Sequence, residues 1–324
     1  MRFIWRNVII FMKQIVLLCK RVLTQGKGSM KKRFLCMMTA GILAVSMLAG
    51  CGSAGGQVTA ESLLQDVQKK CENMKSMETH TTTEITLDAE ALGGTSMDMT
   101  MDMTMQTTTD PVANYMKGSI GILGATLDME MYAIVEDDQI CTYTGMADQW
   151  MVQKMDYDKD SMEKINAAAE DLLKSKDSLQ LADETEEVDG TEAYIITGSI
   201  SGEDVKNLMG SMESTLSSLT GGTDMNLDDI SVEFTYAISK EDKMPLYMDM
   251  TFNGLAAGEG DEQVTFSKFN MKMEYTNYDT VEAITVPQEV IDSAVDVTEY
   301  MNELQNETST ETDTESETEL QSAA

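Results

Sequence analysis

Basic residues are scarce in most of this 324-residue chain, and arginine is missing from nearly all of it. No arginine follows Arg33, and residues 51–324 hold 14 lysines against 56 acidic side chains, a net charge of −42. Without a basic patch, this segment would repel nucleic acid and anionic lipid headgroups. It also lacks the guanidinium groups that commonly clamp phosphates, which argues against phosphoryl chemistry. Its acidity favours solubility and a monomeric state.

Histidine is nearly absent as well. His80 is the only one, and it stands in a threonine-rich stretch. Catalysis by a nucleophile and a base normally needs a His or Lys beside a Ser or Cys. Acidic residues are so numerous that a pair of carboxylates carries little information. We therefore predict no enzymatic activity, no catalytic residue, no metal site and no cofactor.

Cysteine is sparse, with five residues in the whole chain. If the chain is cut before Cys51, only Cys71 and Cys141 remain as disulfide partners for each other. We favour the interpretation that both are buried thiols, which act as small apolar side chains. A disulfide between them is the alternative.

The N-terminal part of the chain contains a targeting segment. Lys31-Lys32-Arg33 precede an uncharged apolar run over residues 34–47, which is short for a membrane span. Leu48-Ala49-Gly50-Cys51 follow directly and resemble the lipobox of bacterial lipoprotein precursors. The resemblance implies cleavage between Gly50 and Cys51, and acyl chains such as palmitate on Cys51. Two such chains anchor a protein stably, so we predict a lipid-anchored protein on the outer, extracytoplasmic face of the cell membrane.

Composition divides the chain into five segments. Residues 30–50 are the predicted signal peptide, and the glycine-rich residues 51–57 are a flexible tether. Residues 58–301 form the predicted domain, and the acidic, threonine-rich residues 302–324 are a disordered tail. We interpret residues 1–29 as an extension upstream of the true start at Met30. A small amphipathic helix on the membrane surface is the alternative for that extension.

Three segments repeat apolar residues at three- and four-residue spacing, which predicts helices. They cover about residues 59–77, 159–175 and 203–219. Thr59 is the expected N-cap of the first helix, and Gly221-Gly222 end the third.

Between these helices the apolar period changes to two. The pattern is cleanest at 97–105, where methionine alternates with Asp and Thr, and it recurs at 127–135, 232–238, 246–252 and 269–275. Strict alternation predicts half-buried strands of an antiparallel sheet, with one apolar and one wet face. One such sheet with a few helices on one face is the simplest architecture.

Polar turns separate the predicted strands, as hairpins require. The clearest turns are Asp137-Asp138, Asp189-Gly190 and Lys240-Glu241-Asp242-Lys243. Pro245 follows the last of these and predicts either an edge strand or the start of a strand.

Four features together resemble a known family. The first is an amphipathic helix after the tether. The second is the motif Leu127–Tyr132, followed by Tyr143 and Gln149-Trp150-Met151. The third is Lys240–Leu246, and the fourth is Tyr275–Tyr278 leading to Ile284–Val290. With them the domain resembles the LolA/LolB lipoprotein carriers and their LppX/LprG relatives, through uncharacterised lipoproteins of Gram-positive bacteria. The resemblance implies an α+β fold, a curved antiparallel half-barrel with about three helices on its concave face. Members with known roles hold an acyl chain or glycolipid between sheet and helices.

Methionine is abundant, with 23 residues after position 50. Core filling is the favoured interpretation, because Met is flexible and tolerant. The second is an adaptable apolar cavity for a ligand, and we predict that it is lined by Met99, Met101, Met103, Met129, Met131, Met248, Met250, Met271 and Met273. The third is capture of Cu(I) by thioethers, although no histidine accompanies them.

The functional hypotheses follow these interpretations. The first is a membrane-anchored lipoprotein that binds a lipid or another hydrophobic ligand in the methionine-rich cavity. The alternative is a non-catalytic envelope interaction protein with a filled core, and the minor alternative is a Cu(I)-binding lipoprotein.

Overall fold

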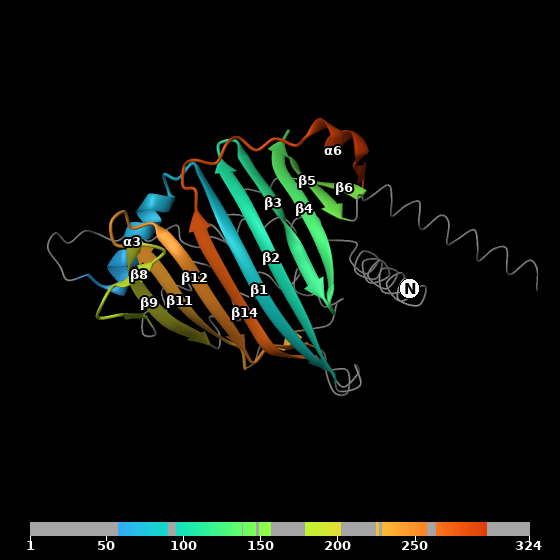
Figure 1. The fold of residues 1–324 in the computed structure, drawn as a ribbon. Coiled ribbons are helices and arrows are strands. Elements are labelled where there is room, and N and C mark those ends of the chain that lie inside the picture. Colours follow the sequence, from blue (N-terminus) through green and yellow to red (C-terminus); the bar gives the residue numbers. More distant parts are fainter. Residues whose placement is uncertain are drawn as a thin grey trace, which may run out of the picture.

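The computed structural model describes residues 58–89, 95–137, 139–146, 149–156, 179–201, 225–226, 229–257 and 264–296. They form two helices and fifteen strands (Figure 1). In chain order these are α3 (Ala60–Cys71), β1 (Ser76–Ala89), β2 (Thr95–Thr109), β3 (Val112–Ile122), β4 (Ala125–Glu136), β5 (Gln139–Met146), β6 (Gln149–Asp156), β7 (Gln180–Leu181), β8 (Glu186–Val188), β9 (Thr191–Ser201), β10 (Met225–Asn226), β11 (Ser231–Ser239), β12 (Pro245–Asn253), β13 (Ala256–Ala257), β14 (Val264–Thr276), α6 (Gln288–Ser293) and β15 (Val295–Asp296).

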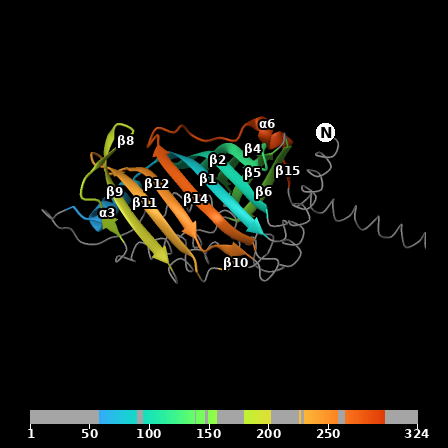
Figure 2. The ribbon, with the colours of Figure 1, turned by 60° about the horizontal axis from the view of Figure 1, so that its bottom comes forward.

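All fifteen strands belong to one open sheet. Its order is β15-β6-β5-β4-β3-β2-β1-β14-β12-β11-β9-β7, with β8, β10 and β13 paired beside this path. Neighbouring strands are antiparallel except β15, which pairs parallel with β6. The prediction of an antiparallel, curved sheet with few helices is therefore confirmed (Figures 1 and 2).

The predicted strands and turns coincide with observed elements. The five segments of period two lie in β2, β4, β11, β12 and β14. Asp189 and Gly190 both adopt positive φ, 48° and 81°, in the two-residue turn between β8 and β9, as a twisted hairpin requires. Pro245 is the first residue of β12, where its missing N–H costs least.

Helix α3 begins where Thr59 predicts it and ends earlier than expected. Thr59 accepts a hydrogen bond from the Ser62 backbone, and the Ser62 side chain returns the contact, which forms a capping box. The helix stops at Cys71 rather than near residue 77. The apolar spacing in the sequence continues to Met74 and Met77 because both side chains are buried in the same cluster as the helix. Met74 reaches this cluster from the connecting turn and Met77 from β1.

The count of about three helices on one face is not borne out. Two helices lie in the described residues, α3 and α6, at opposite ends of the sheet (Figures 1 and 2). Helix α6 was not predicted. The predicted helices at 159–175 and 203–219 lie outside the described residues.

The two helices also pack against opposite faces of the sheet. Leu63 and Val67 of α3 contact the face that carries Ile196 and Tyr275. Val290 of α6 packs with side chains of β5 and β6 that point the other way, namely Cys141, Tyr143 and Val152. Helix α6, for which no prediction was made, covers the other face because this end of the sheet carries apolar side chains there.

Cys71 and Cys141 are both free thiols. Cys71 packs beside the α3 core and Cys141 lies in the α6 cluster, so the two lie on opposite faces of the sheet. Burial raises the pKa of Cys71 to about 11. The favoured interpretation of free, buried thiols is confirmed for Cys141, whereas Cys71 is free but only partly buried.

Candidate functional site

One face of the central sheet, which we call the methionine face, carries all nine predicted methionines. Strand register places Met248 beside Met273, and Met250 beside Met271. On the other side of β1, Met103 lies opposite Gly118 of β3, and Gly118 in turn lies opposite Met129. Because side chains alternate between faces at every residue, the nine methionines of β2, β4, β12 and β14 point to the same side.

The nine methionines are divided between two clusters. Met248, Met250, Met271 and Met273 pack against the core beneath α3, so they help to fix the helix on the sheet. Met101, Met103, Met129 and Met131 form a second cluster with Met105, Met116 and Ile120, which we call the β2–β4 methionine cluster. Met99 is half-buried on β2 beyond this cluster.

Gly118 gives the β2–β4 methionine cluster its close packing. A Cβ at this position would lie 2.0 Å from the backbone oxygen of Asp102 and 2.6 Å from the sulfur of Met103. The glycine therefore leaves space that the Met103 side chain occupies. Flexible thioethers beside a glycine form a surface that can repack around different apolar shapes.

The methionine face is uncharged over its six central strands. Strand register shows that every second residue of each strand points to this face. These residues lie in Thr79–Leu87 of β1, Met97–Thr107 of β2, Asn114–Ile122 of β3, Leu127–Val135 of β4, Met248–Phe252 of β12 and Phe269–Tyr275 of β14. None of them is Asp, Glu, Lys, Arg or His. Such a face can be covered by an apolar partner without burying an unpaired charge, which would cost free energy.

The opposite face, which we call the charged face, holds the ionisable side chains of the same strands. Lys268 pairs with Glu84 at 2.6 Å and Lys272 with Glu274 at 2.7 Å. His80 lies between two carboxylates, with Nε2 3.0 Å from Asp102 and Nδ1 3.3 Å from Glu274. The strands thus separate charge from apolar surface across the sheet.

The pKa of His80 is raised above its ordinary value. The hydrogen bond to Asp102 is the main cause, desolvation opposes it, and Glu274 adds to the increase. A raised pKa in the folded state stabilises the protein below the unfolded pKa of about 6.5, and this contribution is lost as the pH rises through the folded pKa.

We expect the protein to unfold at a slightly higher temperature at pH 6 than at pH 8. The His80 side chain is 38% exposed, so solvent screens the interaction and the gain is at most about 1 kcal/mol. Thermal unfolding of the wild type and of His80→Gln at both pH values measures it. The wild type should lose stability between pH 6 and 8 and the variant should lose less; equal pH dependence in both proteins contradicts the assignment.

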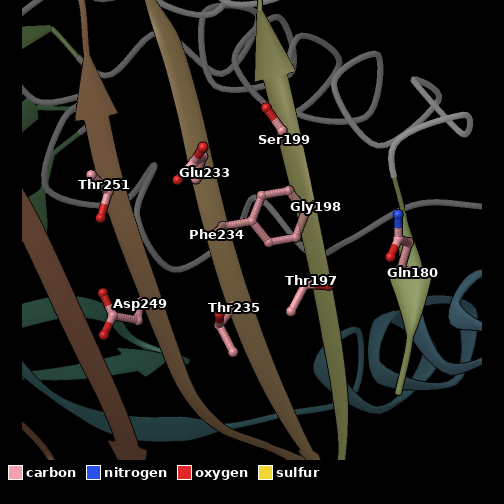
Figure 3. A pocket seen from close by; sticks show the side chains of 9 residues that line it. All are labelled: Gln180, Thr197, Gly198, Ser199, Glu233, Phe234, Thr235, Asp249 and Thr251. Carbon is pink, nitrogen blue, oxygen red and sulfur yellow. The ribbon is translucent and has the colours of Figure 1, made fainter. Parts of the chain in front are cut away.

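A shallow groove of about 500 Å³ lies over β9, β11 and β12 (Figure 3). Most of its lining is polar: Gln180, Thr197, Ser199, Glu233, Thr235, Asp249 and Thr251, together with Gly198 and Phe234. In Figure 3 the Phe234 ring reaches from β11 toward Gly198, where a Cβ would come within 2.5 Å of it. None of the predicted methionines lines this groove.

In the part of the chain that the structure describes, neither helix is long and apolar enough to cross a bilayer. Within the same ranges, no group of three or more His, Cys, Asp or Glu residues is arranged so that it could hold a metal ion.

Several residues of the methionine face were missed by sequence reasoning. Met116 lies between Met105 and Met131 in one cross-strand row, and its alternation with Gly118 and Ile120 was a signal that could have located it. Thr79 and Thr83 are each 2% exposed on the same face. They gave no apolar signal, because threonine is a polar residue type.

A comparison with protein-family models shows to which family the chain belongs. Residues 59–295 match the model of a family of unknown function, DUF6612. The chain belongs to the DUF6612 family. No curated protein matches it.

Some solved structures share features of this DUF6612 protein at low similarity. Lipoprotein LppX of Mycobacterium tuberculosis is 15% identical, with 71% of this chain and 100% of that chain covered, and a TM-score of 0.35. LprF from Mycobacterium bovis is 12% identical, with 72% and 99% covered and a TM-score of 0.38. A β-barrel-like protein with a DUF1849 domain from Brucella abortus is 10% identical, with 64% and 100% covered and a TM-score of 0.24.

Proposed function

We propose that this DUF6612 protein is an extracytoplasmic lipoprotein, anchored through Cys51, whose methionine face binds an acyl lipid or another apolar ligand. The observation that carries the proposal is the separation of charge across the sheet. Six adjacent strands are uncharged and methionine-rich on one face and carry ionisable residues on the other.

The place of the ligand follows from how the methionine face is filled. At the α3 end, Leu63, Val67 and Ile196 are almost fully buried and leave little apolar surface uncovered. In the β2–β4 methionine cluster, Met101, Met105 and Met129 are only partly buried. We therefore assign the acyl chain to the β2–β4 end of the face.

Binding of an apolar fluorescent dye tests the proposed function. The protein, extracted from membranes and delipidated, should enhance the dye's emission with saturation near one site, and long-chain lipids should displace the dye. A protein with a completely filled core, such as an envelope docking protein, should give no saturable enhancement. That result would favour the docking alternative.

Replacing Cys51 by Ala tests the anchor separately. We expect a mass that retains residues before position 51 and lacks the diacylglycerol, because the lipobox resemblance makes Cys51 both the acylated residue and the first residue after cleavage. Intact mass of the membrane-extracted protein measures both features. Cys36→Ala is the matched control, since its residue is removed with the signal peptide and the mature mass should not change. An unlipidated wild-type protein that retains its N-terminal residues contradicts the anchor.

A further inference from the structure

Three hydroxyl groups on the methionine face are buried with no good hydrogen-bond partner. Tyr236 is 1% exposed and Thr79 is 2% exposed, and neither side-chain oxygen has a hydrogen-bond partner among the residues that the structure describes. Tyr275 is 7% exposed, and its hydroxyl reaches only the sulfur of Met273, at 3.8 Å. A buried hydroxyl that lacks a partner carries the cost of its lost hydration. A group that accepts hydrogen bonds here would remove this cost.

Two of the three hydroxyls are neighbours in the fold. Thr79 of β1 lies directly opposite Tyr275 of β14 on one side and Met105 of β2 on the other. Met105 packs against both the buried cluster beneath α3 and the β2–β4 methionine cluster. Thr79 and Tyr275 therefore adjoin the surface to which the acyl chain is assigned. Tyr236 of β11 is buried in the cluster beneath α3, and β12 and β14 lie between it and β1.

These groups are neutral donors at physiological pH. Burial raises the pKa of Tyr236 and of Tyr275 far above the ordinary tyrosine value. No strand residue on this face is cationic, and both lysines of α3, Lys69 and Lys70, are exposed. An ionised carboxylate or phosphate placed here would be buried without a counter-ion, which is strongly unfavourable.

We propose that the ligand carries an uncharged hydrogen-bonding group, such as an ester carbonyl or an alcohol, and that Thr79 and Tyr275 receive this group while the acyl chain lies on the β2–β4 methionine cluster. The inference rests on the proposed function, because it assigns the polar end of the same ligand. It names the ligand class as neutral lipids rather than free fatty acids or phospholipids.

Dye displacement by four probes of equal chain length tests this assignment. Hexadecane, hexadecan-1-ol, methyl palmitate and palmitate differ only at one end. At neutral pH the alcohol and the ester should bind about three- to tenfold more tightly than hexadecane, as one or two added hydrogen bonds would give. Palmitate should bind more weakly than either of them.

Removing single hydroxyls distinguishes recognition from packing. Tyr275→Phe and Thr79→Val should each reduce the preference for the ester over hexadecane by about threefold or more, and leave hexadecane affinity unchanged. Neither should lower the unfolding temperature appreciably, since the Thr79 hydroxyl has no hydrogen-bond partner among the described residues and the Tyr275 hydroxyl reaches only the sulfur of Met273. Tyr278→Phe is the matched control: its hydroxyl donates to the Pro245 oxygen at 2.8 Å, so its loss should lower stability and leave the preference intact.

The outcomes separate this inference from the proposed function. If hexadecane and the neutral lipids bind equally and Thr79→Val changes nothing, the inference is wrong and the apolar site stands. Buried water then satisfies the hydroxyl groups. A preference for palmitate also overturns the inference. If the dye itself does not bind, no probe can displace it, and both proposals fail.

Discussion

An aspartate in place of Met103 is expected to abolish uptake of apolar ligands. Met103 is 8% exposed at the centre of the β2–β4 methionine cluster, and none of the residues that the six central strands place on this face is a cation that could compensate a carboxylate. Burying it unpaired should cost about 3 kcal/mol or more in folding, and dye affinity should fall by at least about tenfold. Urea denaturation and dye titration measure the two effects.

Two control variants make this result specific. Met103→Leu preserves apolarity and volume, so uptake should stay close to that of the wild type. Thr104→Asp puts the same charge on the same strand but on the charged face, between His80 and Lys117, and should change stability by no more than about 0.5 kcal/mol. If Met103→Asp binds the dye as the wild type does, the methionine face is not the binding surface.

Truncation of Leu63 to Ala is expected to lower the free energy of unfolding by about 2–5 kcal/mol. Leu63 is 1% exposed and packs from α3 into the cluster that contains Ile196, Tyr236 and Ile238. The loss combines the transfer of the removed carbons with the cavity that remains, because strands on a sheet close only partly around it.

Lys69→Ala is the matched control for α3. Lys69 is exposed in the last turn of the same helix, so its replacement should alter stability by no more than about 0.5 kcal/mol. Midpoints of urea denaturation for both variants measure the difference. A change of less than about 1 kcal/mol for Leu63→Ala would contradict the docking of α3 on the sheet.

The alternation of apolar and polar residues predicted a strand wherever the two faces of that strand differ strongly in polarity. In β2 the methionines are half-buried or buried, while Asp98, Thr100 and Asp102 are exposed. Near a strand end the rule weakens: Leu127 at the start of β4 is 39% exposed although its register matches Met129. A lone end position has too few neighbours to bury it.

Strand β1 was not predicted, because its buried positions are threonines. Thr79 and Thr83 are each 2% exposed, and each lies between two methionine-rich neighbours. Threonine suits a strand through its branched Cβ, but a scan for apolar residues cannot separate its buried face from its wet face. The central strand of the candidate site therefore became visible only through its partners.

Helix α6 and the division of the methionines also required three-dimensional information. Six residues are too few to show a helical period, and only the long-range contact of Val290 with β5 and β6 explains why α6 lies where it does. The sequence marks all nine methionines alike. Their separation into the α3 core and the β2–β4 methionine cluster arises because β1, which has no methionine on this face between Thr79 and Leu87, lies between β14 and β2.

The separation of charge across the sheet offers a physical account of the composition. A net charge of −42 over residues 51–324 keeps the protein soluble, and the sheet places charges of its six central strands on one face. The other face is left to thioethers, threonines and aromatic rings, whose adaptability suits a ligand of variable shape.

Native mass spectrometry of the membrane-extracted protein tests the central claim most directly. The account predicts a protein that begins at acylated Cys51 and carries one additional lipid, released on activation as an uncharged species. Met103→Asp should carry none, whereas Met103→Leu should carry it as the wild type does. A wild-type protein that is always empty, and that takes up no offered lipid, would contradict a ligand-binding role for the methionine face.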